Sequence, residues 1–251
     1  MTATNEKEVL RHFLEFPLWT SDPVFQLFST LEGAVERANP DNRREHFLYV
    51  EGKRKDKVVL VAHADSYFDE LLSPANKGII HAVEERNGRF YSKNDHGLGL
   101  GADDRAGCAM LWLLRHSGHS LLITDGEERG LTGSSWLMDC HPDIADALNT
   151  RHQFMVQLDR QRATDFKTYS VGTDVFRDFI HTQTGYNEPD RDRRSDIVAL
   201  CRDICGVNFS IGYYEEHTAS EYLVIKEWMH SLKVVRKLLE NPLPRFPLGV
   251  E

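Results

Sequence analysis

The chain begins with two segments of helical character. Residues 6–16 carry apolar side chains at three- and four-residue spacing, which predicts a helix; these side chains are Val9, Leu10, Phe13 and Leu14. A second helix is predicted to begin in SDPVFQLF, because Asp22 suits the cap and Pro23 suits the first helical position. We expect this helix to end near residues 38–40, which read Ala-Asn-Pro.

Five short apolar runs farther along the chain have the length of buried strands. They are HFLYVEG, KVVLVA, LLIT, FMVQL and VNFSIGYY, at residues 46–52, 57–62, 121–124, 154–158 and 207–214. Helical patterns lie between several of these runs, most clearly at residues 104–116 and 221–240. Buried strands that alternate with amphipathic helices predict an α/β fold of three layers, with the sheet between two layers of helices.

Length and composition fit one soluble globular unit. The 251 residues are enough for one substantial α/β domain, and no repeat or long linker divides them, so we predict a single domain over 1–251. The polar, aperiodic stretch 182–196 predicts a loop over the sheet edge or over the site. A formal net charge of -9 gives no support to a nucleic-acid partner.

The cysteines and the N-terminus bear on the compartment. Cys108, Cys140, Cys201 and Cys205 form no CxxC pair. A zinc site at Cys201 and Cys205 is less favoured than buried small side chains, because no set of His or Cys partners lies near them in the sequence. Sparse cysteine suggests a reducing compartment. The N-terminus lacks the apolar core of a signal peptide, and no run approaches the roughly 20 apolar residues that span a bilayer, so we predict a cytoplasmic protein without a membrane partner.

Metal-binding types of side chain follow the apolar runs or open a helix. They are His63 and Asp65 after KVVLVA, Asp103 after a Gly-rich loop, Glu127 and Glu128 after LLIT, Asp159 at the end of FMVQL, and His217 after VNFSIGYY. In open α/β sheets, ligands bind outside the carboxyl ends of the strands, so we expect these side chains to share one edge. Two histidines and several carboxylates suit two zinc-like ions and a catalytic base.

The order HAD, GADD, EE, D, H resembles the co-catalytic di-zinc exopeptidases over about residues 57–240. That superfamily includes bacterial aminopeptidases, peptidase T, glutamate carboxypeptidases and related deacylases. GADDRAG and EEHTASEY carry the likeness most specifically. The resemblance implies a zinc-exopeptidase-like α/β/α sandwich around a mixed, mostly parallel sheet. The short gaps before Asp103 and before His217 leave no room for the lid or dimerisation domain of many relatives, so we expect a single catalytic domain.

The resemblance also implies a ligand set. His63 and Asp159 would bind one Zn²⁺, and Glu128 and His217 would bind the other. Asp103, the first Asp of GADD, would bridge the two ions. Mixed His and carboxylate ligands also accept Co²⁺ or Mn²⁺, so the sequence leaves the metal open.

Two further acids would act beside the metals. The resemblance makes Glu127 the general base, which takes a proton from water and passes it to the leaving amine. It makes Asp65 the residue that holds the His63 ring and fixes its tautomer. Glu127 and Asp65 are thus the predicted catalytic side chains outside the ligand set.

The function predicted from these motifs is metal-dependent hydrolysis of an amide bond, most simply by an aminopeptidase-like exopeptidase. The substrate would be a small peptide. The alternative is an amidase or deacylase that acts on N-acyl amino acids or similar molecules. Two further hypotheses are less favoured. A single-zinc glutaminyl cyclase would not need the second metal site, and a non-enzymatic scaffold would not need an intact base. The sequence leaves the substrate and the oligomeric state open.

Arginines in the 182–196 loop raise the question of substrate recognition. Arg191, Arg193 and Arg194 could grip a substrate carboxylate as an Arg fork. A solvated loop balanced by neighbouring aspartates is the favoured interpretation. Similarly, His96 is more simply a loop histidine than a group that reaches the site.

Overall fold

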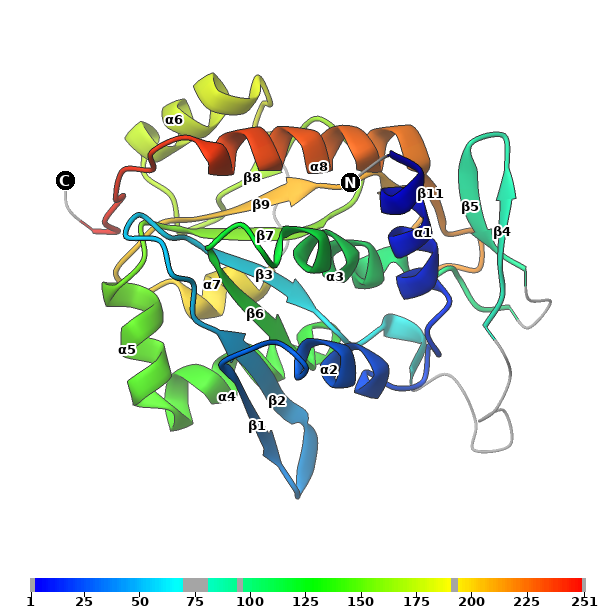
Figure 1. Ribbon diagram of the computed structural model, residues 1–251, viewed down its shortest axis with the longest axis horizontal. Helices are drawn as coiled ribbons and strands as arrows, with labels where there is room; N and C mark the ends of the chain where they lie inside the picture. The colour runs from blue at the N-terminus through cyan, green and yellow to red at the C-terminus, as the bar shows by residue number, and fades with distance from the viewer. Residues whose placement is uncertain (1–2, 70–80, 94–96, 191–193, 250–251) are drawn as a thin grey trace.

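The computed structural model describes residues 3–69, 81–93, 97–190 and 194–249. Its centre is a seven-stranded sheet in the order β1-β2-β6-β3-β7-β9-β8 (Figure 1). The strands are β1 (Ala34–Asn39), β2 (Asn42–Val50), β3 (Val59–His63), β6 (Ser120–Thr124), β7 (Met155–Arg160), β8 (Phe166–Lys167) and β9 (Gly206–Ser210). Neighbours among β6, β3, β7 and β9 run parallel, whereas β1, β2 and β8 pair antiparallel. The sheet is therefore mixed around a parallel centre, as predicted.

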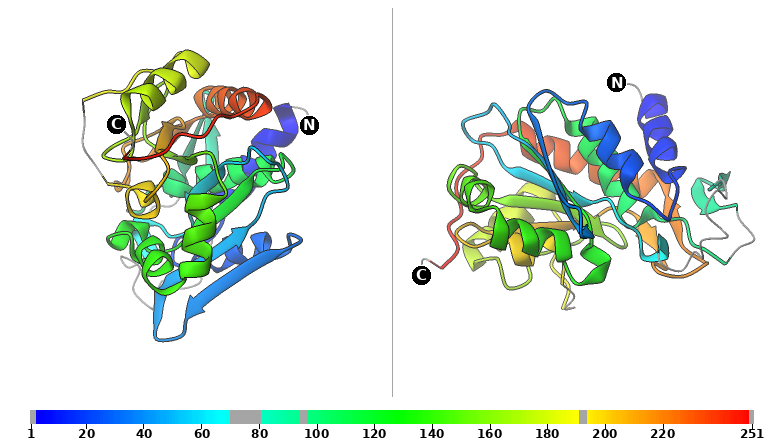
Figure 2. Two further views of the ribbon diagram at one scale, coloured as in Figure 1. Left: turned by 90° about the vertical axis from the view of Figure 1, so that its left-hand side faces the viewer. Right: turned by 90° about the horizontal axis from the view of Figure 1, so that it is seen from below.

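Helices cover both faces of this sheet (Figures 1 and 2). One face packs against α1 (Ala3–Leu14), α2 (Asp22–Phe28), α3 (Ala102–Leu114), α6 (Asp174–Thr184) and α8 (Ile225–Glu240), and the other against α4 (Thr132–Cys140), α5 (Pro142–Thr150) and α7 (Asp196–Leu200). Within β3, Leu60 and Ala62 enter the first core while Val59 and Val61 enter the second, as side-chain alternation along a strand requires. The α/β/α sandwich is confirmed. Within the described ranges, no helix combines the length and apolarity needed to traverse a bilayer.

A small second sheet lies beside the main one. Its four strands have the order β10-β11-β5-β4, with β4 at Val83–Arg86, β5 at Arg89–Ser92, β10 at Tyr213–Tyr214 and β11 at Tyr222–Val224. The hairpin of β4 and β5 comes from the segment between β3 and α3, and β10 and β11 flank His217. This sheet thus ties two chain segments that are distant in sequence (Figure 1).

The second predicted helix is shorter than its pattern suggested. α2 ends at Phe28, so the expected end near residues 38–40 is wrong. Residues 34–39 form β1 instead and pair with β2 along its length. Gly33 has a φ of 77°, which breaks the helical path at little steric cost. The hydrogen bonds and packing of the sheet edge then outweigh a weak local helix preference.

The other predicted elements are present with shifted ends. α1, α3 and α8 coincide with three of the helical patterns, except that residues 222–224 belong to β11. The run 207–214 is divided between β9 and β10 at Ile211 and Gly212, where Gly212 has a φ of 92°. The loop predicted at 182–196 begins inside α6 and ends where α7 begins, at Asp196.

Candidate metal centre

The predicted ligands meet at the carboxyl ends of the central strands. His63 is the last residue of β3, and Asp159 is the penultimate residue of β7. Glu127 and Glu128 start the short 3₁₀ helix η3 (Glu127–Arg129), which follows β6 after a tight turn at Asp125 and Gly126. Asp103 and His217 come from the start of α3 and from the loop between β10 and β11. All the predicted side chains therefore come to one edge from separate elements.

Asp103 lies between the two histidines. Its Oδ1 is 3.1 Å from His63 Nε2, and its Oδ2 is 3.3 Å from His217 Nε2. One carboxylate therefore presents one oxygen to each half of the site. A bridging ligand would need this geometry, and the bridging role expected for the first Asp of GADD stays a prediction.

Each histidine also has a carboxylate of its own. His63 Nε2 is 3.4 Å from Asp159 Oδ1, and His217 Nε2 is 2.9 Å from Glu128 Oε1. His63 with Asp159 and His217 with Glu128 are the two pairs that the family resemblance implied. Ligand atoms of His63, Asp103 and Glu128 lie within 4.8 Å of one another, so the two halves of the site adjoin at Asp103.

Asp104 lies beside this group but is used differently. Its Oδ2 accepts the backbone N–H of His63 at 3.2 Å, and its Oδ1 accepts the N–H of Gly107 at 2.9 Å. It also stands within reach of a metal together with His63 and Asp159. Because backbone donors occupy both of its oxygens, Asp104 is less available to a cation than Asp103 is.

Asp65 contacts both the histidine and the glutamate loop. Its Oδ1 lies 3.2 Å from His63 Nδ1, on the side of the ring away from the cluster. The same carboxylate accepts the backbone N–H groups of Glu127 and Glu128, each at 3.2 Å. Asp65 therefore lies outside the space between the histidines, where it can orient the His63 ring and the backbone of Glu127 and Glu128.

Negative charge is crowded into the buried site, and the pKa values of its side chains are shifted accordingly. Burial, together with the nearby charge of Asp103, raises the pKa of Asp159 to about 7. Burial also raises the pKa of Glu128 and lifts the pKa of Glu127 well above its usual range. Burial opposes protonation of His217, but hydrogen bonds with Asp103 and Glu128 still raise its pKa to about 10. The raised pKa values show that protons offset part of the negative charge crowded into this buried site. Divalent ions would neutralise the same charge.

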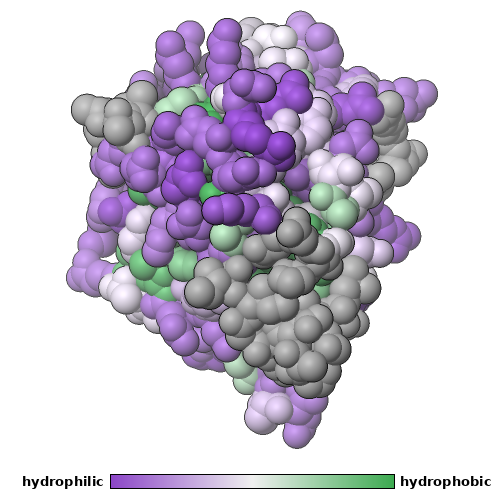
Figure 3. Space-filling model, turned by 90° about the vertical axis from the view of Figure 1, so that its right-hand side faces the viewer, coloured by the Kyte–Doolittle hydropathy of each residue, from purple (hydrophilic) through white to green (hydrophobic). Residues whose placement is uncertain are grey.

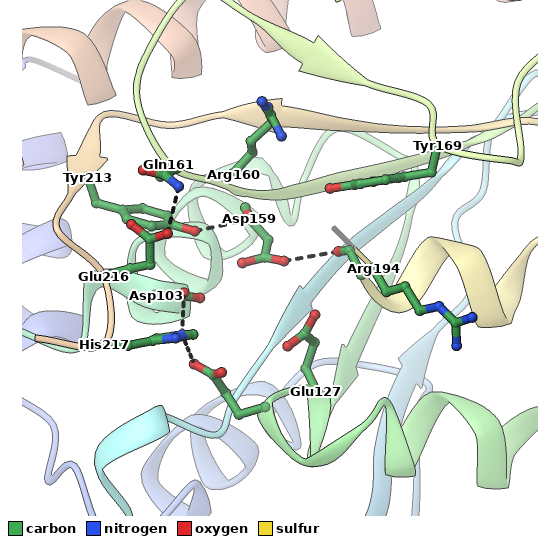
Figure 4. A pocket seen from close by; sticks show the side chains of 12 residues that line it. Asp103, Glu127, Asp159, Arg160, Gln161, Tyr169, Arg194, Tyr213, Glu216 and His217 are labelled. Atoms are coloured by element: carbon green, nitrogen blue, oxygen red, sulfur yellow. Dashed lines mark hydrogen bonds and ion pairs between the residues drawn. The ribbon is translucent and has the colours of Figure 1, made fainter. Parts of the chain in front are cut away.

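Glu127 differs from its neighbour Glu128. Its carboxylate has no hydrogen-bond or ion-pair partner among the residues that the structure describes, although its backbone N–H is held by Asp65. It lines the cavity beside Asp103 and Asp159, and Figure 4 shows it across the site from His217. Glu128 is instead engaged by His217. Among the described residues, Glu127 therefore has an unpaired carboxylate, whereas the carboxylate of Glu128 is paired with His217.

Residues that the sequence did not single out hold Asp159 in place. Gln157 Nε2 donates to Asp159 Oδ2 at 3.0 Å, and Ser195 Oγ donates to the same oxygen at 3.1 Å. Oδ1 is left to face His63. The Asp159 backbone N–H donates to the side-chain oxygen of Asn208 at 3.0 Å. Ser195 lies in the polar stretch 182–196, which the sequence predicts to be a loop over the sheet edge or the site, whereas Gln157 and Asn208 lie within apolar strand runs that gave no such signal.

Glu221 supports the loop that carries Asp103. Its Oε2 accepts the backbone N–H of Gly101 at 2.7 Å, and its Oε1 accepts that of Asp103 at 3.2 Å. Burial raises the pKa of Glu221 to about 8. The motif EEHTASEY contains this residue, so its presence was visible in the sequence but its partner was not.

A small polar cavity opens over these groups. It has a volume of about 120 Å³ and is lined by Asp103, Glu127, Glu128, Asp159, Arg160, Gln161, Tyr169, Arg194, Ser195, Tyr213, Glu216 and His217 (Figure 4). Glu216 accepts a hydrogen bond of 2.6 Å from the Gln161 amide. The described residues on the face towards which the strand ends point are mostly hydrophilic (Figure 3). The cavity is suited to a small, polar substrate group.

Of the loop arginines, Arg194 lines the cavity while its side chain is exposed. Arg191 and Arg193 lie outside the described residues, as does His96. Among the residues that the structure describes, Arg194 is the loop arginine at the cavity rim, and the Arg fork considered from the sequence stays a prediction.

The fold is shared with solved aminopeptidases at low sequence identity. Aminopeptidase PepT from Bacillus cereus ATCC 10987 aligns with a TM-score of 0.65 and 12% identity over 96% of this chain and 98% of that chain. A tripeptidase from Staphylococcus aureus gives 0.66 and 14% over 96% and 98%, respectively. An aminopeptidase from the archaeon Desulfurococcus kamchatkensis gives 0.63 and 12% over 95% of both chains.

Comparisons of sequence add nothing to this likeness. No protein-family model matches the chain, and no curated protein matches it in sequence. The chain therefore has the α/β/α fold that these peptidases share, as the resemblance of its motifs implied, and its chemistry rests on the residues of its own site.

Proposed function

We propose that this protein is a metal-dependent hydrolase of amide bonds, most simply an aminopeptidase-like exopeptidase with two divalent ions. The observation that carries the proposal is the position of Asp103, whose two oxygens stand 3.1 Å and 3.3 Å from His63 and His217. A carboxylate shared by two histidines, each with a second carboxylate, has little purpose without two cations. The fold shared with solved aminopeptidases agrees with this assignment.

The donor set fits zinc-like ions. His63 and Asp159 would hold one ion, His217 and Glu128 the other, and Asp103 both; imidazole nitrogen and carboxylate oxygen are the ligands such ions take. When bound, the ions would lower the pKa of water and polarise the scissile carbonyl. Zn²⁺ is the expected metal, with Co²⁺ or Mn²⁺ as substitutes.

Glu127 supplies the proton transfers. Its unpaired carboxylate takes a proton from a water molecule in the cavity as the water oxygen attacks the carbonyl carbon. The adduct then collapses as the carbon–nitrogen bond breaks, and Glu127 returns the proton to the leaving nitrogen. Asp65 keeps Glu127 in place through the backbone N–H of the same residue.

The test pairs substrates with a variant. Protein loaded with Zn²⁺ is incubated with a library of free-amine peptides and with a panel of N-acyl amino acids. Cleavage of the peptides is expected, and Glu127→Gln should lower turnover by roughly 10²- to 10⁴-fold while two ions per chain remain bound. Cleavage confined to acylated compounds would favour the amidase alternative. Unchanged turnover in Glu127→Gln, or loss of metal from it, would contradict the role given to Glu127.

A further inference from the structure

Tyr169 occupies an unusual position at the cavity. It follows β8 and adopts a φ of 51°, the left-handed region that bulky residues seldom enter. Its backbone carbonyl accepts a hydrogen bond of 3.4 Å from Arg177 Nη2. Tyr169 lines the cavity, and Figure 4 shows its ring extending across it with the hydroxyl directed inwards, towards the side on which Asp159 lies. Backbone strain of this kind is common where a side chain must be aimed at a site.

The surroundings of the hydroxyl fix where its hydrogen can point. Asn208 Nδ2 donates to the Tyr169 oxygen at 3.4 Å. Asn208 cannot accept the hydroxyl hydrogen in this arrangement, because the atom that it presents to Tyr169 is its amide nitrogen, which is a donor only. No described residue accepts from Tyr169. The hydrogen is therefore available to the cavity.

A second tyrosine of the cavity shows the contrast. The Tyr213 hydroxyl donates to the backbone carbonyl of Asp159 at 3.1 Å, so its hydrogen is already committed. Burial and the charge of Asp159 raise the pKa of Tyr169 to about 12, so Tyr169 keeps its hydrogen at neutral pH. Tyr169 is thus the cavity tyrosine with a hydrogen bond left to give.

We propose that the Tyr169 hydroxyl donates a hydrogen bond to the oxygen of the scissile carbonyl as that oxygen becomes negative. This role rests on the proposed function. As water attacks and loses its proton to Glu127, the carbonyl π-electrons move onto the oxygen, and Tyr169 stabilises that charge without giving up its proton. When the carbon–nitrogen bond breaks, the electrons return to form the new carboxyl group. A donor preset at a site of developing charge lowers the barrier more than it tightens substrate binding.

The experiment compares zinc-loaded wild type with Tyr169→Phe, and with Tyr186→Phe as a distant control. Tyr186 is also buried, with its hydroxyl 3.4 Å from Ser231 Oγ. For Tyr169→Phe we expect kcat to fall on the order of 10²-fold with a small change in KM. Metal content and thermal midpoint should stay those of wild type. Tyr186→Phe should leave kcat unchanged.

A binding measurement separates this role from the proposed function. A phosphinic pseudodipeptide, which carries a tetrahedral phosphinate in place of the scissile amide, is titrated by calorimetry. Tyr169→Phe should weaken its binding by about the factor lost in kcat, while the affinity for a product amino acid stays the same. Equal phosphinate affinity in the two proteins, or a loss confined to KM, would overturn the role of Tyr169. If the wild type binds phosphinate through Tyr169 but cleaves no peptide, the proposed function fails and the Tyr169 site stands. A wild type that neither binds phosphinate nor cleaves peptides would overturn both.

Discussion

The carboxylate of Asp65 accepts the backbone N–H of Glu127 at 3.2 Å. It lies equally close to His63 Nδ1 and also accepts the N–H of Glu128. One buried side chain therefore couples the strand that carries a candidate ligand to the turn that carries the candidate base.

Replacing Asp65 should weaken metal binding more than it weakens the fold. Asp65→Asn keeps the shape but removes the charge that favours one tautomer of His63, and it offers one acceptor where two N–H groups now bind. We expect metal affinity to fall roughly 10- to 100-fold, as measured by competition with a chromophoric chelator. Asp139→Asn, at an exposed position, is the matched control and should bind metal like wild type. Equal affinity in Asp65→Asn would show that the Asp65 contact is dispensable.

Removing His217 should empty one half of the site. His217 approaches Glu128 and Asp103, and its ring is stacked on Tyr67 with centroids 4.3 Å apart. We expect His217→Ala to retain about one ion per chain after dialysis, since His63, Asp159 and Asp103 remain. Elemental analysis checks the ratio, and His230→Ala on the exposed side of α8 serves as the control. Retention of two ions would remove His217 from the ligand set.

Gly107 should tolerate no side chain. An added Cβ would collide with the backbone carbonyl of Leu158 and with the Asp104 carboxylate, because α3 packs directly on β7 there. We expect Gly107→Ala to lower the free energy of unfolding by about 1–3 kcal/mol in urea denaturation. Since Leu158 precedes Asp159, metal affinity should fall as well. Lys233→Ala, exposed on α8, should change neither quantity, and wild-type values in Gly107→Ala would argue against this close packing.

The buried imidazole of His152 should make stability depend on pH. Burial lowers its pKa from 6.5 to about 4, and its Nε2 lies 2.7 Å from Ser120 Oγ. Between these values the unfolded chain binds a proton that the folded chain does not, so stability falls as the pH drops below about 6.5.

The contribution of His152 at about pH 5 should be lower than at pH 7 by about 2 kcal/mol. Urea denaturation of wild type and His152→Gln at both pH values measures it as the change in their difference in free energy. The difference cancels the carboxylates that titrate in the same range. A difference that does not vary with pH would show that His152 does not titrate in this way.

The central strands and the long helices could be predicted from the sequence because their signal is local. Runs such as KVVLVA are apolar on both faces and must be buried, and the strand ends then determine where His63 and Asp159 emerge. β1 could not be predicted in this way. Its residues alternate poorly, and β1 becomes a strand through pairing with β2.

The sequence by itself determined the residue types of the site, their order along the chain and the layered fold, because motif spacing and burial patterns are properties of the chain. The tertiary structure decided how those residues share the work. It placed Asp103 between two histidines. It also set the Asp65 carboxylate to accept backbone N–H groups and left the Glu127 carboxylate unpaired among the described residues. It also directed the Tyr169 hydroxyl into the cavity. These relationships join segments distant in sequence, and they arise when packed elements bring those segments to one edge of the sheet.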